Sequence, residues 1–257
     1  QRQLMAAIAP PCRIVEFGVA HTGQWNMACD EWLLESVLDG GPATIRVYAW
    51  SRPTVSLGYF QQPEDVASNP RLAGIDHVRR LSGGGAIVHE HEWTYSCVVP
   101  PGDTANIPGD RLYARIHQAL IDEIKATTSH DIPQLRLRGQ TPSDTQSPAL
   151  CFSRTAADDV VHDGHKVIGS AQRRRRGGIL QHGSLLLKRS SHAPDFPGLF
   201  DLIPSLALPG NFSELMARAI ASTLQWTATV TPLSDSEKTG IEQLVAQQSM
   251  RSPRTSR

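Results

Sequence analysis

Residues 164–187, GHKVIGSAQRRRRGGILQHGSLLL, contain two strand-like runs separated by four consecutive arginines. The first run, 165–171, alternates in the manner of a strand, and the second, 178–187, is mostly apolar like a buried central strand. The four arginines predict the solvated tip of a hairpin, and the alternative is a docking patch for an acidic partner. Strict alternation of the first run places the following side chains on one face: Lys166, Ile168, Ser170 and Gln172.

Strand-like and helix-like patterns cover most of the remaining chain. Further strands are predicted at 13–20, 44–50, 54–60, 76–80, 86–89, 93–99 and 158–162. Helices are predicted at 24–38 and about 110–126, and two more begin at the capping boxes formed by Asn211 with Glu214 and by Ser234 with Glu237. Residues 139–149 contain almost nothing apolar and predict a loop. The mixture of strands and helices predicts an α+β sheet domain with flexible termini at 1–12 and 251–257, and the length allows one large domain or two small ones.

The composition narrows the classes of function. Of the 257 residues 40% are hydrophobic, which is enough for a packed core. Lys plus Arg and Asp plus Glu each total 25, and this balance argues against a protein that binds nucleic acid. No apolar run has the length of a membrane span, and the four cysteines form no C-x-x-C pair. We therefore expect a cytoplasmic protein with reduced thiols and no metal site, nucleic-acid partner or membrane partner.

The stretch RRLSGGGAIVH at 79–89 is the first candidate binding element. Three consecutive glycines between strand-like segments let the backbone approach a ligand, and their N–H groups can hold an acyl carbonyl or a phosphate. The alternative is a tight hairpin turn with no ligand. The candidate substrate-binding residues of this stretch are Arg80, Ser82, Gly83, Gly84, Gly85 and His89.

Cys151 is the candidate nucleophile because it follows the polar loop directly, where a nucleophile must be reachable. A thiol attacks a thioester as its thiolate, and a nearby ammonium lowers the thiol pKa. Lys166, fifteen residues later, supplies that charge if the intervening chain folds back. The alternatives are an inert core thiol and a solvated lysine. Gln181 and His182 interrupt an apolar strand, so they either line a pocket or are hydrogen-bonded core residues.

Together, RRLSGGGAIVHEHEWTYS at 79–96 and GHKVIGSAQRRRRGGILQHGSLLL at 164–187 resemble the two signature blocks of the biotin/lipoate A/B protein ligase family. The helix that contains Asn26, Met27, Ala28 and Asp30, and the segment WSRPTVSLGYFQ at 50–61, are similar to earlier blocks of that family. The resemblance covers residues 13 to about 188. It implies a single α+β domain over 13–250, the class II synthetase-like catalytic domain, in which helices flank a mixed β-sheet that forms the acyl-binding cleft.

The resemblance implies one of three reactions. Octanoyltransferases take octanoate from acyl carrier protein onto a cysteine and pass it to a lipoyl-domain lysine. Lipoate ligases use ATP and Mg to form an acyl-adenylate. Lipoyl amidotransferases use a cysteine to move the acyl group between lipoyl proteins. Cys151-Phe152 before the Lys166 block, and Thr94-Tyr95-Ser96, resemble the ligase-like octanoyltransferase branch. Gly83 to Gly85 match the ligase form equally well. A silent lipoyl-protein-binding module is the non-enzymatic alternative.

The resemblance therefore implies a protein N-octanoyltransferase with Cys151 and Lys166 as catalytic residues and no cofactor. Octanoyl-acyl carrier protein is the expected donor, and a lipoyl-domain protein such as the glycine-cleavage H protein is the expected acceptor. ATP with Mg is expected only for the ligase alternative. In the second block, the expected substrate-binding residues are Gly169, Ser170, Gln172 and His182.

Overall fold

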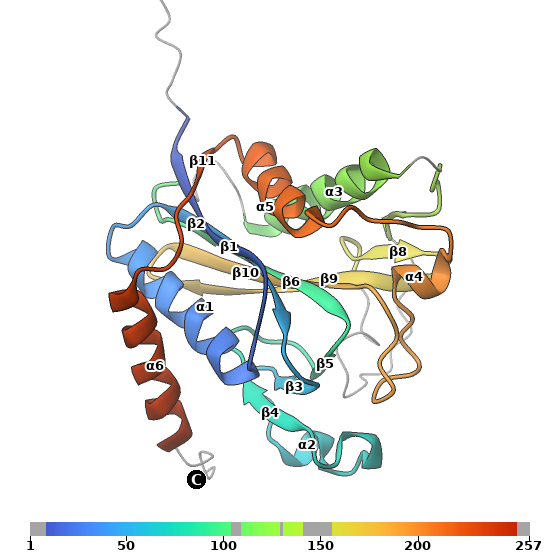
Figure 1. The fold of residues 1–257 in the computed structure, drawn as a ribbon, viewed down its shortest axis with the longest axis horizontal. Helices are drawn as coiled ribbons and strands as arrows, with labels where there is room; N and C mark the ends of the chain where they lie inside the picture. The colour runs from blue at the N-terminus through green and yellow to red at the C-terminus, as the bar shows by residue number, and fades with distance from the viewer. Residues whose placement is uncertain (1–8, 104–108, 129–130, 141–155, 251–257) are drawn as a thin grey trace, which may run out of the picture.

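The computed structural model describes residues 9–103, 109–128, 131–140 and 156–250 (Figure 1). The predicted loop at 139–149, all but its first two residues, lies outside these ranges, and so do Cys151 and residues 251–257. The described elements are, in chain order, β1 (Pro11–His21), α1 (Gly23–Leu38), β2 (Ala43–Trp50), β3 (Thr54–Leu57), α2 (Glu64–Ala67), η1 (Pro70–Leu72), β4 (Asp76–Arg79), β5 (Ile87–His89), β6 (Glu92–Val99), α3 (Gly109–Thr127), β7 (Arg136–Leu137), β8 (Val160–His162), β9 (His165–Arg175), β10 (Gly178–Leu186), α4 (Leu199–Leu202), α5 (Phe212–Thr223), β11 (Thr227–Val230) and α6 (Asp235–Met250).

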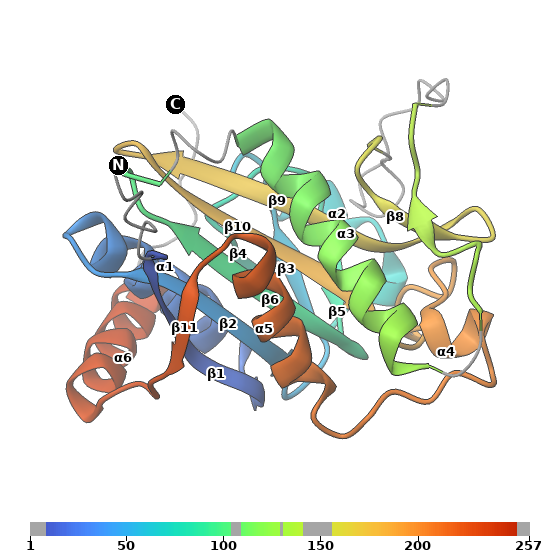
Figure 2. The same cartoon turned by 90° about the horizontal axis from the view of Figure 1, so that it is seen from above.

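An eight-stranded sheet in the order β11-β1-β2-β6-β10-β9-β8-β7 crosses the described part of the molecule. β1 runs parallel to β11 and β2, and the other neighbours are antiparallel, so the sheet is mixed. Helices α3 and α5 cover one face, whereas α1 and α6 lie on the other (Figures 1 and 2). None of the described helices combines the length and apolar character needed to cross a bilayer.

Each face of the large sheet has its own apolar core. Ile45 and Tyr95 face α3 and α5, where they pack with Ile116 and Ile220. On the opposite face, residues of α1, β6 and β10 form a second cluster: Leu33, Leu34, Val98 and Leu180. Burial of a large aliphatic side chain contributes about 1.5–3 kcal/mol, so these two clusters hold the layers together.

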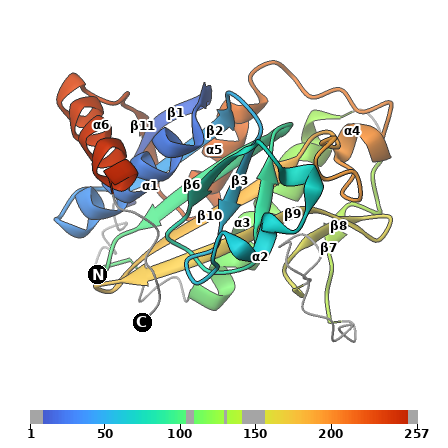
Figure 3. The same cartoon turned by 90° about the horizontal axis from the view of Figure 1, so that it is seen from below.

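A three-stranded sheet, in the order β4-β3-β5, lies on the same side of the large sheet as α1 (Figures 1 and 3). β3 is parallel to β4 and antiparallel to β5. The predicted strand 54–60 ends at Leu57, because the chain turns at Gly58. A Cβ at Gly58 would come within 2.0 Å of the Gly84 carbonyl oxygen, so this position requires glycine.

The predicted α+β class, with a mixed sheet flanked by helices, is confirmed. The predicted flexible terminus 1–12 extends too far, because β1 begins at Pro11, where pairing with β11 buries Cys12. The capping box at Ser234 is present: its hydroxyl accepts from the Glu237 N–H, and Glu237 Oε2 accepts from the Ser234 N–H. The box predicted at Asn211 is absent, since its side chain makes no capping bond and Glu214 instead accepts from Arg218.

Candidate functional site

A pocket lies where strands of the small sheet face β6, β9 and β10 of the large sheet. Its apolar lining comes from α1, β2, β5 and β9: Met27, Tyr48, Trp50, Ile87 and Ala171. Its polar lining consists of Ser56, Arg80, His89, Thr94, Lys166, Ser170, His182 and Ser184, with Gly169 and Gly183 between them. Most of the surface that these residues expose to the pocket is apolar, and an apolar pocket with converging polar groups is the usual form of a small-molecule site.

Lys166 reaches the pocket because β9 contains a bulge. Val160 pairs with Ile168 but Val161 pairs with Lys166, so Val167 is an extra residue that interrupts the alternation. Strict alternation had grouped Lys166 with Ile168, and this is wrong: Ile168 packs in the core, whereas Lys166 lies over Gly169. A Cβ on Gly169 would come 2.3 Å from Lys166 Cε and 2.8 Å from Nζ, so the absence of a side chain there makes room for the amine.

The Lys166 amine is held by an acidic partner. Its Nζ lies 3.0 Å from Asp159 Oδ1, and the two side chains are only 8% and 6% exposed. A buried ion pair of this kind fixes the position of both groups, because separating them leaves an uncompensated charge. Asp159 comes from the turn before β8, and its Oδ2 accepts from the Ala156 N–H at 2.6 Å.

A second polar chain runs along the wall formed by β3, β5 and β6. His89 Nδ1 lies 2.8 Å from Glu92 Oε1, and His89 Nε2 lies 2.7 Å from the Ser56 hydroxyl. Burial by itself would raise the pKa of Glu92, but the charge and hydrogen bond of His89 and the hydroxyls of Thr94 and Ser184 outweigh it, so this pKa is lowered. His89 thus joins the Glu92 carboxylate, through Nδ1, to the Ser56 hydroxyl, through Nε2.

The same histidine supports the aromatic part of the pocket. The Trp50 ring stacks on His89 with centroids 3.9 Å apart and planes 9° apart. Trp50 Nε1 donates to Thr94 Oγ1 at 2.8 Å, so the indole is fixed at its face and at its polar edge.

A third cluster surrounds His182 on β10. Its Nδ1 lies 3.2 Å from Asp30 Oδ2, and its Nε2 contacts the Ser82 hydroxyl. Asp30 also accepts from Tyr48 and Arg46. Burial opposes ionisation of Asp30, yet the hydrogen bond from His182 and the charge of Arg46 together lower its pKa. His182 is thus both a pocket residue and a hydrogen-bonded core residue, whereas Gln181 bonds to Tyr95 and Gln172.

The glycine loop is fastened by Arg80. The Arg80 Nη2 group donates to the carbonyls of Gly83 and Gly85 at 2.8 and 2.7 Å, while Nη1 donates to the Ser56 carbonyl at 2.8 Å. Gly84 has a φ of +95°, a conformation that a side chain would strain. A Cβ on Gly83 would meet nothing within 4 Å. The loop therefore borders the small sheet next to the pocket, and none of its three glycines is among the residues that line it.

The predicted residues separate into three groups. Arg80, His89, Lys166, Gly169, Ser170 and His182 line the pocket. The others lie behind its wall or beside it: Ser82 contacts His182, Gln172 donates to Gln181, and Gly83 to Gly85 surround Arg80. Cys151 lies outside the described residues. The other three cysteines are buried, and burial raises the pKa of both Cys12 and Cys29 to about 12.

The sequence analysis missed several residues of this site. Asp159, Glu92 and Trp50 fix Lys166, His89 and the pocket wall, yet none was singled out. Trp50 and Asp30 were quoted only within the resemblance to the family's early blocks. The available signal was weak: Asp159 lies in the predicted strand 158–162, and Glu92 directly precedes the predicted strand 93–99.

Comparisons with known proteins agree with this architecture. Residues 22–195 match the family model described as the lipoyl protein ligase A/B catalytic domain. The octanoyltransferase LipM of Moorella thermoacetica is 38% identical over 180 residues, 68% of this chain and 64% of the relative. The corresponding protein of Geobacillus kaustophilus is 37% identical over 171 residues, 63% of this chain and 61% of the relative. The chain thus spans less than two thirds of the length of these relatives.

Solved structures with low sequence identity share the fold. A lipoate-protein ligase A bound with ATP has a TM-score of 0.68 at 18% identity, over 94% of this chain and 97% of that one. A bipartite lipoate protein ligase of Thermoplasma acidophilum has a TM-score of 0.65 at 16% identity, over 95% of each chain. With the family model covering most of the chain, including both glycine-rich blocks and Lys166, this protein belongs to the lipoyl protein ligase A/B catalytic domain family.

Proposed function

We propose that this protein is an octanoyltransferase, which moves an octanoyl group from acyl carrier protein through a thioester on Cys151 to a lysine of a lipoyl-domain protein. The observation that carries the proposal is the position of Lys166. Its amine is buried in a mainly apolar pocket, held 3.0 Å from Asp159 and accommodated by Gly169. The relatives named octanoyltransferase LipM support the choice of reaction within the family.

The pocket offers apolar surface to an acyl chain. Met27, Trp50 and Ile87 offer apolar surface, while the polar residues of the wall are mostly bonded to one another. A buried polar group that already has its hydrogen bonds needs none from a ligand, so methylene groups pack beside it at little cost in free energy. The stacked Trp50 and His89 make this wall rigid.

The first half of the reaction forms the acyl-enzyme. The Cys151 thiolate attacks the carbonyl carbon of the donor thioester, a new C–S bond forms, and the donor sulfur leaves and takes up a proton. The Lys166 ammonium stabilises the attacking thiolate. One thioester replaces another, so no oxidant, nucleotide or metal enters the balance.

In the second half, the acceptor amine attacks the same carbonyl carbon. A C–N bond forms, the C–S bond to Cys151 breaks, and the ammonium of the acceptor loses two protons in all, one before attack and one as the amide forms. Lys166 exchanges these protons with the departing Cys151 sulfur and with solvent. Because an amide is more stable than a thioester, this half runs forward without ATP.

The proposed donor is acidic, and the arginine run is the candidate docking surface. Arg175 and Arg176 pair with Glu35 at the end of α1, at 2.5 and 2.9 Å, so they also fasten the hairpin to the helix. Arg173 lies over the Tyr59 ring, 4.7 Å from its centroid. These contacts leave Arg174, whose guanidinium is 3.4 Å from Gln172, as the arginine best placed to meet a partner.

Intact-mass spectrometry with different donors tests the proposal. The protein is incubated with octanoyl-acyl carrier protein, with octanoate plus ATP and Mg, or with an octanoylated lipoyl-domain protein. We expect an octanoyl adduct from the first donor, located at Cys151 by peptide mapping and lost in Cys151→Ala. Acyl transfer that occurs only with octanoate plus ATP would establish a ligase, and an adduct only from the lipoyl-domain protein would establish an amidotransferase.

A further inference from the structure

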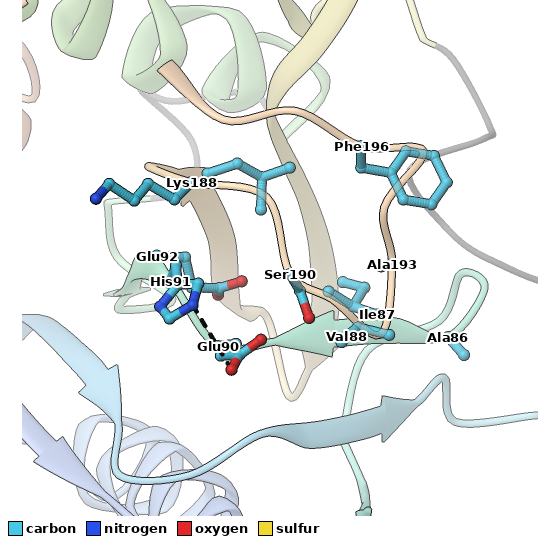
Figure 4. Close-up of a pocket in the computed structure, with 11 residues that line it drawn as sticks. Ala86, Ile87, Val88, Glu90, His91, Glu92, Lys188, Ser190, Ala193 and Phe196 are labelled. Carbon is cyan, nitrogen blue, oxygen red and sulfur yellow. Dashed lines mark ion pairs between the residues drawn. The ribbon is translucent and has the colours of Figure 1, made fainter. Parts of the chain in front are cut away.

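A second hollow adjoins the acyl pocket, on the side of β5 and the chain that follows β10 (Figure 4). Its walls are mostly apolar and include Ala86, Val88, Leu186, Ala193 and Phe196. Ile87 lines both this hollow and the acyl pocket, so the two share a wall. An apolar hollow of this kind suits an alkyl stem better than a fully polar ligand.

Glu90 and Glu92 are among the residues that line this hollow, and each has one buried oxygen without a hydrogen bond among the described residues. The Glu92 side chain is only 1% exposed. Its Oε1 accepts from Thr94 and Ser184 at 2.5 and 2.7 Å, but its Oε2 is buried and has no hydrogen-bond partner within the described residues. The Glu90 side chain is 20% exposed, and its buried Oε2 also finds no hydrogen bond in the described part of the chain.

Leaving a buried carboxylate oxygen without a donor is costly, because no hydrogen bond replaces the lost contact with water. Because the pKa of Glu92 is lowered, this group is ionised at neutral pH and does not relieve the cost by protonation. The nearby His89 donates to Oε1, and His91, half exposed, lies 3.6 Å from the other oxygen of Glu90. The hollow therefore combines apolar walls with two carboxylate oxygens, Glu90 Oε2 and Glu92 Oε2, that have no hydrogen-bond donor among the described residues.

The protein's own lysine at this site does not meet that demand. Lys188 lines the hollow, but its side chain is exposed and its amine points away from the carboxylates in Figure 4. Nor do the described residues offer a cluster of three or more His, Cys, Asp and Glu side chains suited to a metal ion. The complementary ligand is a primary ammonium on a flexible alkyl stem, which is the chemistry of a lysine side chain.

We propose that this hollow binds the acceptor lysine, with its methylene groups along Ile87 and Leu186 and its ammonium between the Glu90 and Glu92 carboxylates. The inference rests on the proposed function, because it requires a lysine-bearing acceptor. Glu92 stands on the boundary of the acyl pocket: the hydroxyls bonded to its Oε1, those of Thr94 and Ser184, both line that pocket. An amine beside Glu92 is consequently brought to the edge of the acyl site before it loses its proton.

A binding experiment on the unacylated protein separates this inference from the reaction. The full chain is titrated with Nα-acetyl-lysine methylamide, and the amide signals of Ile87, Val88 and Leu186 are followed by NMR. Nα-acetyl-norleucine methylamide, which has a similar alkyl stem without the ammonium, serves as the control ligand. Hydrogen bonds to charged groups are worth about 1.5–3 kcal/mol, so we expect the lysine ligand to bind about tenfold to hundredfold more tightly.

Charge-neutral variants identify the groups responsible. Glu92→Gln should reduce the preference for the lysine ligand to about twofold or less, because its carboxylate is the more buried of the two. Since Glu92 also bonds to His89, Thr94 and Ser184, Glu90→Gln provides a second test in a less connected residue, with a smaller loss in the same direction. Glu242→Gln, an exposed change on α6, is the matched control and should bind like the parent.

Equal affinity for the two ligands, or a lysine preference unchanged in both Glu92→Gln and Glu90→Gln, would overturn the inference. Binding of Mg alone with shifts at the same amides, and no response to the lysine ligand, would assign the carboxylates to a cation instead. If the parent binds the lysine ligand but never becomes octanoylated, the proposed reaction is wrong. If it is octanoylated and transfers the group without a lysine preference in this hollow, only the present inference is wrong.

Discussion

Replacing Gly169 by alanine displaces Lys166, while every ionisable side chain of the protein is kept. The new methyl carbon would lie 2.3 Å from Lys166 Cε, whereas ordinary van der Waals contact begins near 3.4 Å, so the end of the lysine has to move by about 1.1 Å. The clashing atoms belong to the far end of a flexible side chain, and we therefore expect an unfolding free energy no more than about 2 kcal/mol below that of the parent. A misplacement of about 1 Å can cost roughly a hundredfold in rate, and this is the loss expected for acyl transfer.

The assay measures single-turnover octanoylation of Cys151 alongside thermal unfolding. Gly210→Ala is the control, because a Cβ at Gly210 meets nothing within 4 Å and its φ is not positive. It should transfer and unfold like the parent. A Gly169→Ala protein that is folded and transfers octanoate at the parent rate would show that the position of Lys166 over Gly169 has no part in the reaction.

Three other changes examine the glycine loop, the attachment of α6 and the thiols. Gly84→Val should destabilise the protein by about 1–3 kcal/mol, because the φ of Gly84 is +95°. Gly83→Ala should unfold like the parent, since a Cβ there meets nothing within 4 Å. Equal unfolding curves for Gly84→Val and the parent would contradict the strain assigned to Gly84. The Arg13 hydrogen bond lowers the Glu237 pKa to about 2, so the parent should be more stable than Glu237→Gln above about pH 4.5 and lose that advantage as the pH falls to about 2. Urea unfolding of both proteins across this pH range measures the difference in stability. A difference that does not change with pH would contradict the prediction. Iodoacetamide at about pH 8 should modify Cys151 in the native protein, as read by peptide mass. The thiols that should remain unmodified are Cys12, Cys29 and Cys97.

Local patterns in the sequence predicted most strands and helices, because burial repeats every two residues in a strand and every three to four residues in a helix. The two predicted capping boxes had different outcomes. Glu214 pairs with Arg218, one turn further along the same helix, and the Asn211 box does not form. Glu237 caps its helix at Ser234 while it also binds Arg13. The capping pattern alone did not reveal that a neighbouring arginine competes for the carboxylate of Glu214.

The bulge in β9 shows the same limit within the site. The run from His165 alternates in sequence, and only its pairing with β8 reveals that Val167 is an extra residue. That single insertion moves Lys166 to its place over Gly169. A pattern of period two gives the face of each residue only while the strand is regular.

The sequence also did not reveal which side chains contact the candidate residues. Asp30 and His182 are 152 positions apart, and Ser82 and His182 are 100 apart, yet they form one buried cluster. Asp159 precedes Lys166 by only seven residues, but nothing in the intervening sequence specifies that the two side chains meet. The resemblance to a family located the blocks, and the folded chain supplies the contacts between them.

The pH dependence of Cys151 alkylation in the parent and in Lys166→Met tests the proposed pairing of these two residues most directly. If the Lys166 ammonium stabilises the Cys151 thiolate, the alkylation profile of Lys166→Met lies at higher pH than that of the parent. Lys166→Arg, which keeps a positive charge but does not exchange protons near neutral pH, should restore part of the shift and accumulate acyl-enzyme. Identical alkylation profiles in the parent and Lys166→Met would contradict a mechanism in which Lys166 activates Cys151.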